Sequence, residues 1–446
     1  MSTDLPDPAR AAEDALVRGA ERVRAELCAQ DEAWGTSGDT GRWTRRRFLA
    51  GAGMAGVAAL GSQLVTSRVA YASGAAAKTT NTLIVVFLRG AADGLRLLVP
   101  ASAVLGVDHL QRVRGNLLPA GAIALPGTSG WALNAAARPL YEQLWRTGEL
   151  AFVPAVNAPG ATRSHFQAQQ YLEHGGSNSL ATGWLDRLLE KLGPGTTFRA
   201  VAQGSAEPSS LAGPQRALVV DSLKDFTFPG WDEIRASSQH AVSSLYRGVH
   251  GTLGRDVPAT MAALATAKRA RSGSGVRNGA AYPKNDFAKA LQDLAAILRA
   301  EVGLQVATVD VGGWDTHTDE AWDFDRQLGD TATSLAAFMT DLGTARRKRV
   351  SVVVMTEFGR RVAMNASGGT DHGHGGVAWL LGGGIVGGVH GRWAKLSTAT
   401  LPDGDVPGWN NPFDILGELA YKRLRAGSLS HVFPGHRVRA LGVARS

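Results

Sequence analysis

The sequence has almost no cysteine. Its one cysteine, Cys28, precedes the segment interpreted below as an export signal, so the chain beyond that signal has no disulfide and no thiolate ligand or nucleophile. The GxSxG elbow of α/β hydrolases, the HExxH zinc helix and the phosphate-binding Walker loop are also absent. Gly382-x-Gly384-x-x-Gly387 leads into GVHGRW rather than into an amphipathic helix, so it indicates a glycine-rich hairpin and not a dinucleotide site.

Long basic runs and long apolar runs are missing too. The formal charge is +8, but the clusters at 268–271 and 346–349 are short, lie near expected helix ends and contain no aromatic residues, so we expect no nucleic-acid binding. The apolar run from Phe48 to Val65 is thinned by glycines and by Ser62 and Gln63. It falls short of the ~20 strongly apolar residues that a span needs. A transmembrane anchor is the alternative interpretation, but we expect no stable span after cleavage.

The N-terminal part has the features of a leader and an export signal. Residues 1–43 are polar, with balanced charge and too little apolar content for a domain. Residues 44–72 contain the twin arginines Arg45 and Arg46, a weakly apolar stretch and an A-x-A cleavage site at 70–72. The sequence therefore predicts recognition by the twin-arginine export machinery and a periplasmic or secreted protein. Such substrates cross the membrane folded, which mildly favours a metalloprotein.

The remainder, 73–446, alternates apolar strands with amphipathic helices and is predicted to form a single α/β domain. Continuous apolar runs at 82–88, 149–156, 304–309 and 350–354 are typical of strands covered on both faces, as in parallel sheets. A helix is expected to begin near Phe166, residues 230–270 look helical, and 271–285 resembles a linker or long loop. The order strand, helix, strand over 304–354 predicts a parallel crossover that brings both strand ends to one edge of the sheet.

Carboxylates and imidazoles follow these strands. The groups are Asp93; Ser164 with His165; Asp310, Asp315 and His317; and Glu357 with Asp371, His372 and His374. Ligands bind outside the carboxyl ends of such strands, and oxygen and nitrogen donors without thiolates suit Zn²⁺, Mn²⁺, Mg²⁺ or Ca²⁺. Two ions would clamp the attacking and leaving oxygens of a displacement on phosphorus or sulfur. The alternatives are an ordinary polar loop and, for Ser164, a simple helix cap.

Five motifs in order carry a family resemblance: FLRGAADGLRLLVP, RSHFQAQQYLEHG, GGWDTH, TEFGR and GTDHGHGG. Together with the twin-arginine leader they resemble an exported bacterial family of unknown function, domain of unknown function 1501, which is related to sulfatases and the alkaline phosphatase superfamily. The resemblance covers roughly 80–445. It implies an alkaline-phosphatase-like three-layer sandwich with a mainly parallel sheet and metal sites at the carboxyl ends of its strands.

The resemblance also implies roles for single residues. Asp93 resembles the first aspartate ligand, Ser164 the nucleophile ahead of a helix, and Asp310 or Asp315 with His317 the Asp and His pair. Glu357 stands where the superfamily has an Asp-His pair, so one expected imidazole is missing unless His372 supplies it. His372 or His374 resembles the distal histidine. No Cys-x-Pro-x-Arg motif is present, which argues against a formylglycine-dependent sulfatase.

These observations predict an exported metal-dependent hydrolase of phosphate or sulfate esters, carried by a small molecule or an envelope polymer. Ser164 is expected to attack, and Arg360 or Arg163 to stabilise the equatorial oxygens. The cofactor is one or two divalent ions, with zinc as first choice. The alternative is a non-catalytic cell-envelope binding protein that keeps the fold. The expected ligands are Asp93, Asp310, Asp315, His317, Glu357, Asp371, His372 and His374.

Overall fold

A computed structural model describes residues 80–446, except for 161, 216, 229–231 and 250. The predicted leader (1–43) and twin-arginine signal (44–72) lie outside the described residues. The described residues divide into two compact units: 80–222 and 273–446 belong to one, and 223–272 belong to the other. The second contains α8 (Asp232–Leu245) and α9 (Gly251–Ser272), where the sequence predicts helix. The prediction of a single domain over 73–446 stays a prediction.

The larger unit is built on an eight-stranded sheet in the order β11-β5-β10-β9-β1-β8-β6-β7. The central strand β1 pairs in parallel with both β8 and β9, and β6 continues in parallel between β8 and β7. Only β10 runs against its neighbours β9 and β5 in the part of the sheet that the structure describes. The strands are β1 (Thr82–Leu88), β5 (Leu150–Val156), β6 (Ala200–Gln203), β7 (Leu218–Val220), β8 (Val306–Val311), β9 (Val350–Thr356), β10 (Gly376–Leu381) and β11 (Gly388–Val389).

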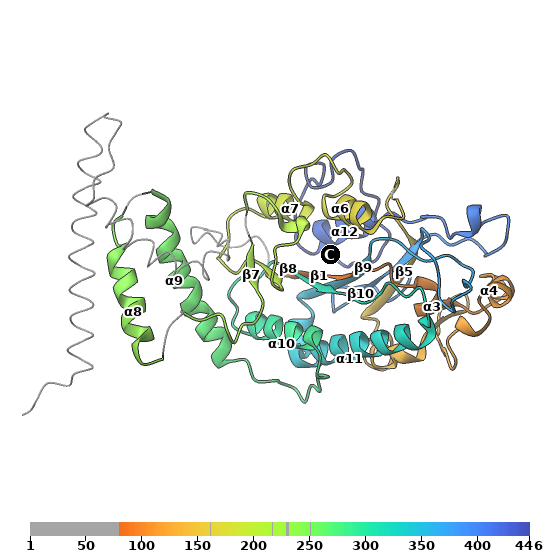
Figure 1. Ribbon diagram of the computed structural model, residues 1–446, viewed down its shortest axis with the longest axis horizontal. Coiled ribbons are helices and arrows are strands. Elements are labelled where there is room, and N and C mark those ends of the chain that lie inside the picture. Colours follow the sequence, from red (N-terminus) through yellow and green to blue (C-terminus); the bar gives the residue numbers. More distant parts are fainter. Residues whose placement is uncertain (1–79, 161, 216, 229–231, 250) are drawn as a thin grey trace, which may run out of the picture. The chain divides into compact units, whose positions relative to one another are not determined.

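Helices cover both faces of this sheet (Figure 1). On one face α6 (His165–Glu173), α7 (Trp184–Leu192) and α12 (Pro412–Lys422) pack their apolar side chains on alternate residues of β1, β9 and β10. On the other face lie α10 (Asp286–Arg299) and α11 (Glu320–Arg347), the latter interrupted at Gly343. Continuous apolar strands suit a sheet buried on both sides. The predicted three-layer α/β sandwich with a mainly parallel sheet is confirmed.

Short elements connect these layers. A second sheet pairs β2 (Leu98–Pro100), β4 (Trp131–Leu133) and β3 (Ile123–Ala124). Among the described residues, no helix is both long and apolar enough to pass through a membrane. The remaining helices are α3 (Gly94–Leu97), α4 (Val107–Arg114), α5 (Arg138–Leu140), a π-helix (Tyr141–Trp145) and 3₁₀ turns at 115–117, 135–137, 209–211 and 402–404.

The crossover predicted over 304–354 is confirmed, with one shift of boundary. Both β8 and β9 run parallel to β1, which lies between them, so their carboxyl ends meet at one edge. The strand predicted at 304–309 is displaced by two residues, because β8 spans Val306–Val311. As a result Asp310 lies within the strand, paired with Phe87, whereas Asp315 and His317 lie in the loop beyond it.

Candidate metal centre

Three histidines and one aspartate converge at the carboxyl edge of the sheet. His165 is the first residue of α6, Asp315 and His317 lie between β8 and α11, and His372 lies between β9 and β10. His372 Nε2 is 3.1 Å from His165 Nε2 and 3.0 Å from His317 Nε2. Asp315 Oδ1 is 3.2 Å from His372 Nε2 and 3.1 Å from His317 Nε2, and Asp315 Oδ2 is 3.5 Å from His165 Nε2.

These separations are those expected of ligands around one small cation. Four ligands placed about 2.0–2.1 Å from a tetrahedral zinc ion lie about 3.3 Å from one another. The five distances between the histidine and aspartate atoms lie between 3.0 and 3.5 Å. His165, Asp315 and His372 also form a group whose ligand atoms all lie within 4.8 Å of one another. The donor types and these five separations are compatible with a bound metal ion.

The outer hydrogen bonds of the imidazoles support the same conclusion. His165 Nδ1 donates to Glu357 Oε1 at 2.7 Å, and His372 Nδ1 donates to the Arg163 carbonyl at 3.0 Å, because both partners can only accept. In the neutral imidazoles the two Nε2 lone pairs then face each other. The hydrogen bond to Glu357 raises the pKa of His165, so a proton on its Nε2 can also bridge the pair. Burial and the Arg360 guanidinium lower the pKa of His317, which favours its neutral form. A cation between the nitrogens removes this repulsion, and histidine ligands are held in this way in metal sites.

Glu357 lies behind the cluster rather than in it. Its carboxylate accepts from His165, from Gln169 Nε2 at 2.8 Å, and from the Gly90 N–H at 2.9 Å. Burial opposes ionisation of this carboxyl, but hydrogen bonds from His165, Gln169 and Thr356 outweigh it and lower its pKa to about 2. A permanently ionised Glu357 orients His165 and makes its Nε2 more basic. The sequence predicts Glu357 as a ligand, and in the structure its carboxylate accepts a hydrogen bond from His165 Nδ1.

Arg360 is buried, with its side chain 0% exposed. Its guanidinium donates to the backbone carbonyls of Gly90, Ala91, Trp314 and Thr370 and, at 2.6 Å, to Asp315 Oδ1. These bonds join the loops that follow β1, β8 and β9, so one side chain fixes their relative positions. The sequence predicts contact between Arg360 and substrate oxygens. The structure instead gives Arg360 the role of holding Asp315 in place, because no part of its side chain reaches solvent.

The cluster is open to solvent on one side. The side chains of Asp315 and His317 are 47% and 41% exposed, whereas those of His165 and His372 are 24% and 22% exposed. A fully buried centre would exclude a substrate, whereas the exposed side chains of Asp315 and His317 leave this centre accessible. The geometry therefore permits an outside group to approach the ligand atoms from the side of Asp315 and His317.

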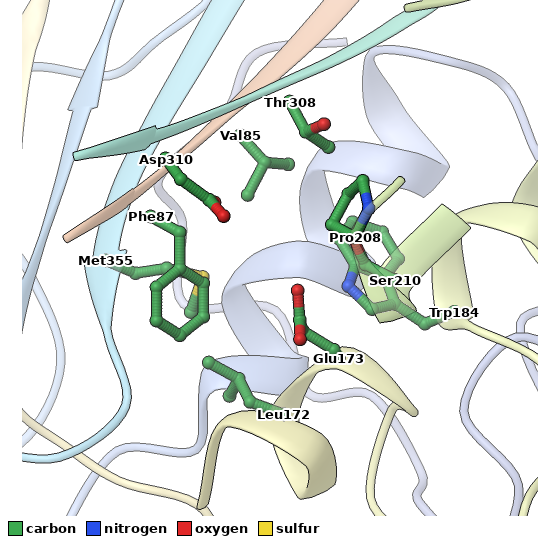
Figure 2. A pocket seen from close by; sticks show the side chains of 10 residues that line it. All are labelled: Val85, Phe87, Leu172, Glu173, Trp184, Pro208, Ser210, Thr308, Asp310 and Met355. Carbon is green, nitrogen blue, oxygen red and sulfur yellow. The ribbon is translucent and has the colours of Figure 1, made fainter. Parts of the chain in front are cut away.

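Two predicted ligands lie in other surroundings. Asp93 is buried in an ion pair with Arg114, and it also caps α3 by accepting from the Leu95 N–H. Asp310 pairs with Arg89 at 2.9 Å, and Arg89 bonds Glu173 at the same distance. Figure 2 shows Asp310 and Glu173 at a small pocket whose walls are mostly apolar, including Phe87 and Trp184. The sequence leaves open whether Asp310 or Asp315 is the ligand, and the structure brings Asp315 to the histidines.

The other predicted residues lie beside the cluster. Asp371 Oδ1 is 3.8 Å from His317 Nδ1, and His374 Nε2 is 3.8 Å from Asp405 Oδ2. Arg163 forms an ion pair with Asp405 and offers its carbonyl to His372. Ser164 is the N-cap of α6, but its hydroxyl makes no capping hydrogen bond, and the residue is exposed. The hydroxyl immediately before His165 is therefore not used by the helix.

His165 and Gln169 are absent from the ligands and catalytic residues predicted from the sequence, although both belong to its RSHFQAQQ motif. The available signal was the position of His165 beside Ser164 at the start of a helix that follows a buried strand. That position resembles a cap, and only the packing of α6 against the loop after β9 shows that its first turn faces His372.

Comparisons with known proteins place the chain in a family. Among solved structures it is similar to an alkaline phosphatase from the Antarctic bacterium TAB5, with 11% sequence identity over 69% of this chain and 93% of that one. The TM-score is 0.28, which supports no inference about function. No curated protein matches. A family model matches residues 151–404, more than half of the chain and including His165, Asp315, His317 and His372. The chain belongs to the family described as "Protein of unknown function (DUF1501)".

Proposed function

We propose that this protein is a metal-dependent hydrolase of phosphate or sulfate esters. The observation that carries the proposal is that His165 Nε2, His317 Nε2 and the Asp315 carboxylate all lie close to His372 Nε2, in a cluster that solvent can reach. A divalent ion bound there, zinc as first choice, supplies a Lewis acid that lowers the pKa of a nearby hydroxyl and polarises an ester oxygen. The described donors gather in one such group, so we propose one ion rather than two.

Each surrounding residue has a task in this proposal. Ser164, whose hydroxyl is exposed and makes no capping bond, is the nucleophile. Arg163, the residue before it, is one third exposed and offers guanidinium donors to the equatorial oxygens. Glu357 and Arg360 hold His165 and Asp315 in place from behind. The ester belongs to a small molecule or an envelope polymer.

A specific observation favours a second function. Three imidazoles and one carboxylate are enough donors to occupy all four positions of a tetrahedral zinc ion, as in structural sites, whereas catalytic sites keep one position open. A non-catalytic cell-envelope protein that uses its ion for stability or binding is therefore the alternative. The exposed side chains of Asp315 and His317 oppose it, because a structural centre has no need of an open side.

The deciding experiment is elemental analysis followed by an ester screen. Wild type, His372→Ala and the matched control His431→Ala, whose histidine pairs with Glu190 elsewhere on the surface, are purified in parallel. We expect about one equivalent of divalent metal in wild type and control and none in His372→Ala. A metal-free wild type would remove the proposal, and a metal-loaded protein inactive on phosphate and sulfate esters, including esters with a second anionic group, would favour the alternative.

Ser164→Ala tests the nucleophile. We expect the metal content to stay unchanged while turnover falls by 10³-fold or more, because the metal ligands are intact and the attacking oxygen is gone. Thr162→Ala is the control for the neighbouring hydroxyl and is expected to keep activity within severalfold. Turnover of Ser164→Ala at the wild-type rate would remove Ser164 from the mechanism.

Export through the twin-arginine pathway is also a proposal, carried by the sequence of residues 44–72. Replacing Arg45 and Arg46 together by lysine is expected to keep the protein inside the cytoplasm. Cell fractionation measures the outcome, and unchanged export would contradict this localisation.

A further inference from the structure

A second cluster of charged residues adjoins the metal centre. At its middle is Asp405, which is 1% exposed and forms an ion pair with Arg163. His374 Nε2 lies 3.8 Å from Asp405 Oδ2, and Arg361 Nε lies 3.9 Å from Asp405 Oδ1. Around this buried carboxylate the side chains of Arg163, Arg361 and His374 remain 33%, 38% and 37% exposed. The two arginines outnumber the one carboxylate, so the cluster presents net positive charge to solvent.

The backbone ties this cluster to the metal centre. The Arg163 carbonyl accepts from His372 Nδ1 at 3.0 Å. Arg163, whose guanidinium pairs with Asp405, therefore also orients the imidazole of His372 in the metal centre. Residues 359–361 pair with 371–374 through Gly359 N–H to His374 O at 2.7 Å and Arg361 N–H to Asp371 O at 2.9 Å. Arg361 and His374 are therefore fixed on the same pair of segments that presents His372.

The hydrogen bonds leave donors free. The Arg163 guanidinium donates to one Asp405 oxygen and to no other described residue. The Arg361 guanidinium approaches Asp405 only at 3.9 Å. Guanidinium groups that are held in place and partly exposed are the usual receptors for carboxylate, sulfate and phosphate oxygens. A carboxylate as deeply buried as that of Asp405 serves to position the arginines, since it cannot itself reach a ligand.

We propose that Arg361 and His374, held around Asp405 beside Arg163, form an anion subsite that takes a second anionic group of the substrate. This rests on the proposed function for the statement that an ester lies at the metal centre. The substrate class is then an ester with at least two anionic groups, such as a polyanionic chain, rather than a simple monoester. Asp405 is a positioning residue, and Arg361 contacts the anion.

The experiment separates the subsite from the hydrolase. Sodium sulfate is titrated calorimetrically, at constant ionic strength, into wild type, Arg361→Gln, His372→Ala and the control Arg112→Gln, which changes an exposed arginine on α4. We expect Arg361→Gln to bind sulfate at least fivefold more weakly, Arg112→Gln within twofold of wild type, and His372→Ala to bind sulfate although it holds no metal. Thermal melting checks that Arg361→Gln is folded.

A second measurement uses phenylphosphonate and its 4-carboxy derivative with the metal-loaded protein. The added carboxylate is expected to tighten binding at least fivefold in wild type and to have no effect in Arg361→Gln. Sulfate binding that is equal in wild type and Arg361→Gln, or that needs the metal, overturns the subsite and leaves the hydrolase proposal standing. Absence of metal and of esterase activity overturns the hydrolase, while loss of sulfate binding in Arg361→Gln still supports an anion site.

Discussion

The carboxylate of Glu357 supports His165 from behind, and its replacement tests this support. Glu357→Gln keeps the size of the side chain but removes the charge that makes His165 Nε2 basic. We expect metal affinity to fall by roughly 10–100-fold while the fold is kept, as is usual for partners of metal ligands. Competition with a chromogenic chelator measures the affinity. Glu190→Gln, which changes an exposed carboxylate bonded to His431, is the matched control and should have no effect.

Glu320 belongs to a buried group with Asp93 and Arg114. Burial, and after it the Asp93 carboxylate, raise the pKa of Glu320 to about 8. The folded protein therefore holds a proton that the unfolded chain, with its ordinary pKa near 4.5, releases. The corresponding stabilisation is complete below about pH 4.5 and is lost as the pH rises through about 8.

Glu320→Gln imitates the protonated carboxyl and still accepts a hydrogen bond from Thr370. We expect the free energy of unfolding to fall between pH 6 and 9 by roughly 2–3 kcal/mol more in wild type than in this variant. Urea unfolding at the two pH values measures the difference. An equal fall of the free energy of unfolding between pH 6 and 9 in the two proteins would show that Glu320 ionises normally.

The loops at the ends of β1, β8 and β9 are packed against one another at Gly90. Its φ is +120°, and a Cβ there would lie 2.6 Å from the backbone nitrogen of Asp315. Gly90→Ala must therefore displace Asp315. We expect a loss of roughly 1–3 kcal/mol in stability and weaker metal binding.

Gly121→Ala separates this steric effect from the cost of a positive φ. Gly121 has φ +66°, and a Cβ there would meet nothing within 4 Å. Its replacement should reduce stability by only about 1 kcal/mol and leave metal affinity unchanged. Unfolding curves give the stability of Gly90→Ala and Gly121→Ala, and chelator competition gives their metal affinity. Identical metal affinity in the two variants would mean that the loops after β1 and β8 can separate without moving Asp315.

The whole molecule is expected to gain stability from the metal. The proposed ligands come from α6, from the loop after β8 and from the loop after β9, so a bound ion would join segments separated by about 200 residues in the sequence. An ion at 100 times its dissociation constant stabilises the folded state by about 2.7 kcal/mol. Removing it with a chelator should lower the melting temperature of wild type and leave that of His372→Ala unchanged. An equal fall in the melting temperature of wild type and His372→Ala on adding the chelator would show that the ion binds elsewhere in the protein.

Much of the fold follows from short-range patterns in the sequence. The apolar runs of β1, β5, β8 and β9 predict buried strands because both faces of a parallel sheet are covered. The crossover from β8 through α11 to β9 follows from chain order alone. Ser164 at the start of α6 and the polar groups after β8 and β9 were predicted for the same reason, since strand ends and helix starts are local features.

The roles of single residues depended on long-range packing. Asp310 and Asp315 both follow an apolar run, and the two-residue shift of β8 puts one against Arg89 and the other against the histidines. Glu357 and Arg360 have the chemistry of a ligand and an anion receptor, but their burial makes them supports for His165 and Asp315. His165 becomes a candidate ligand only because α6 packs over the loop that carries His372. The sequence determines which donor side chains are available. The tertiary structure decides which of them lie together, because their neighbours come from residues far apart in the chain.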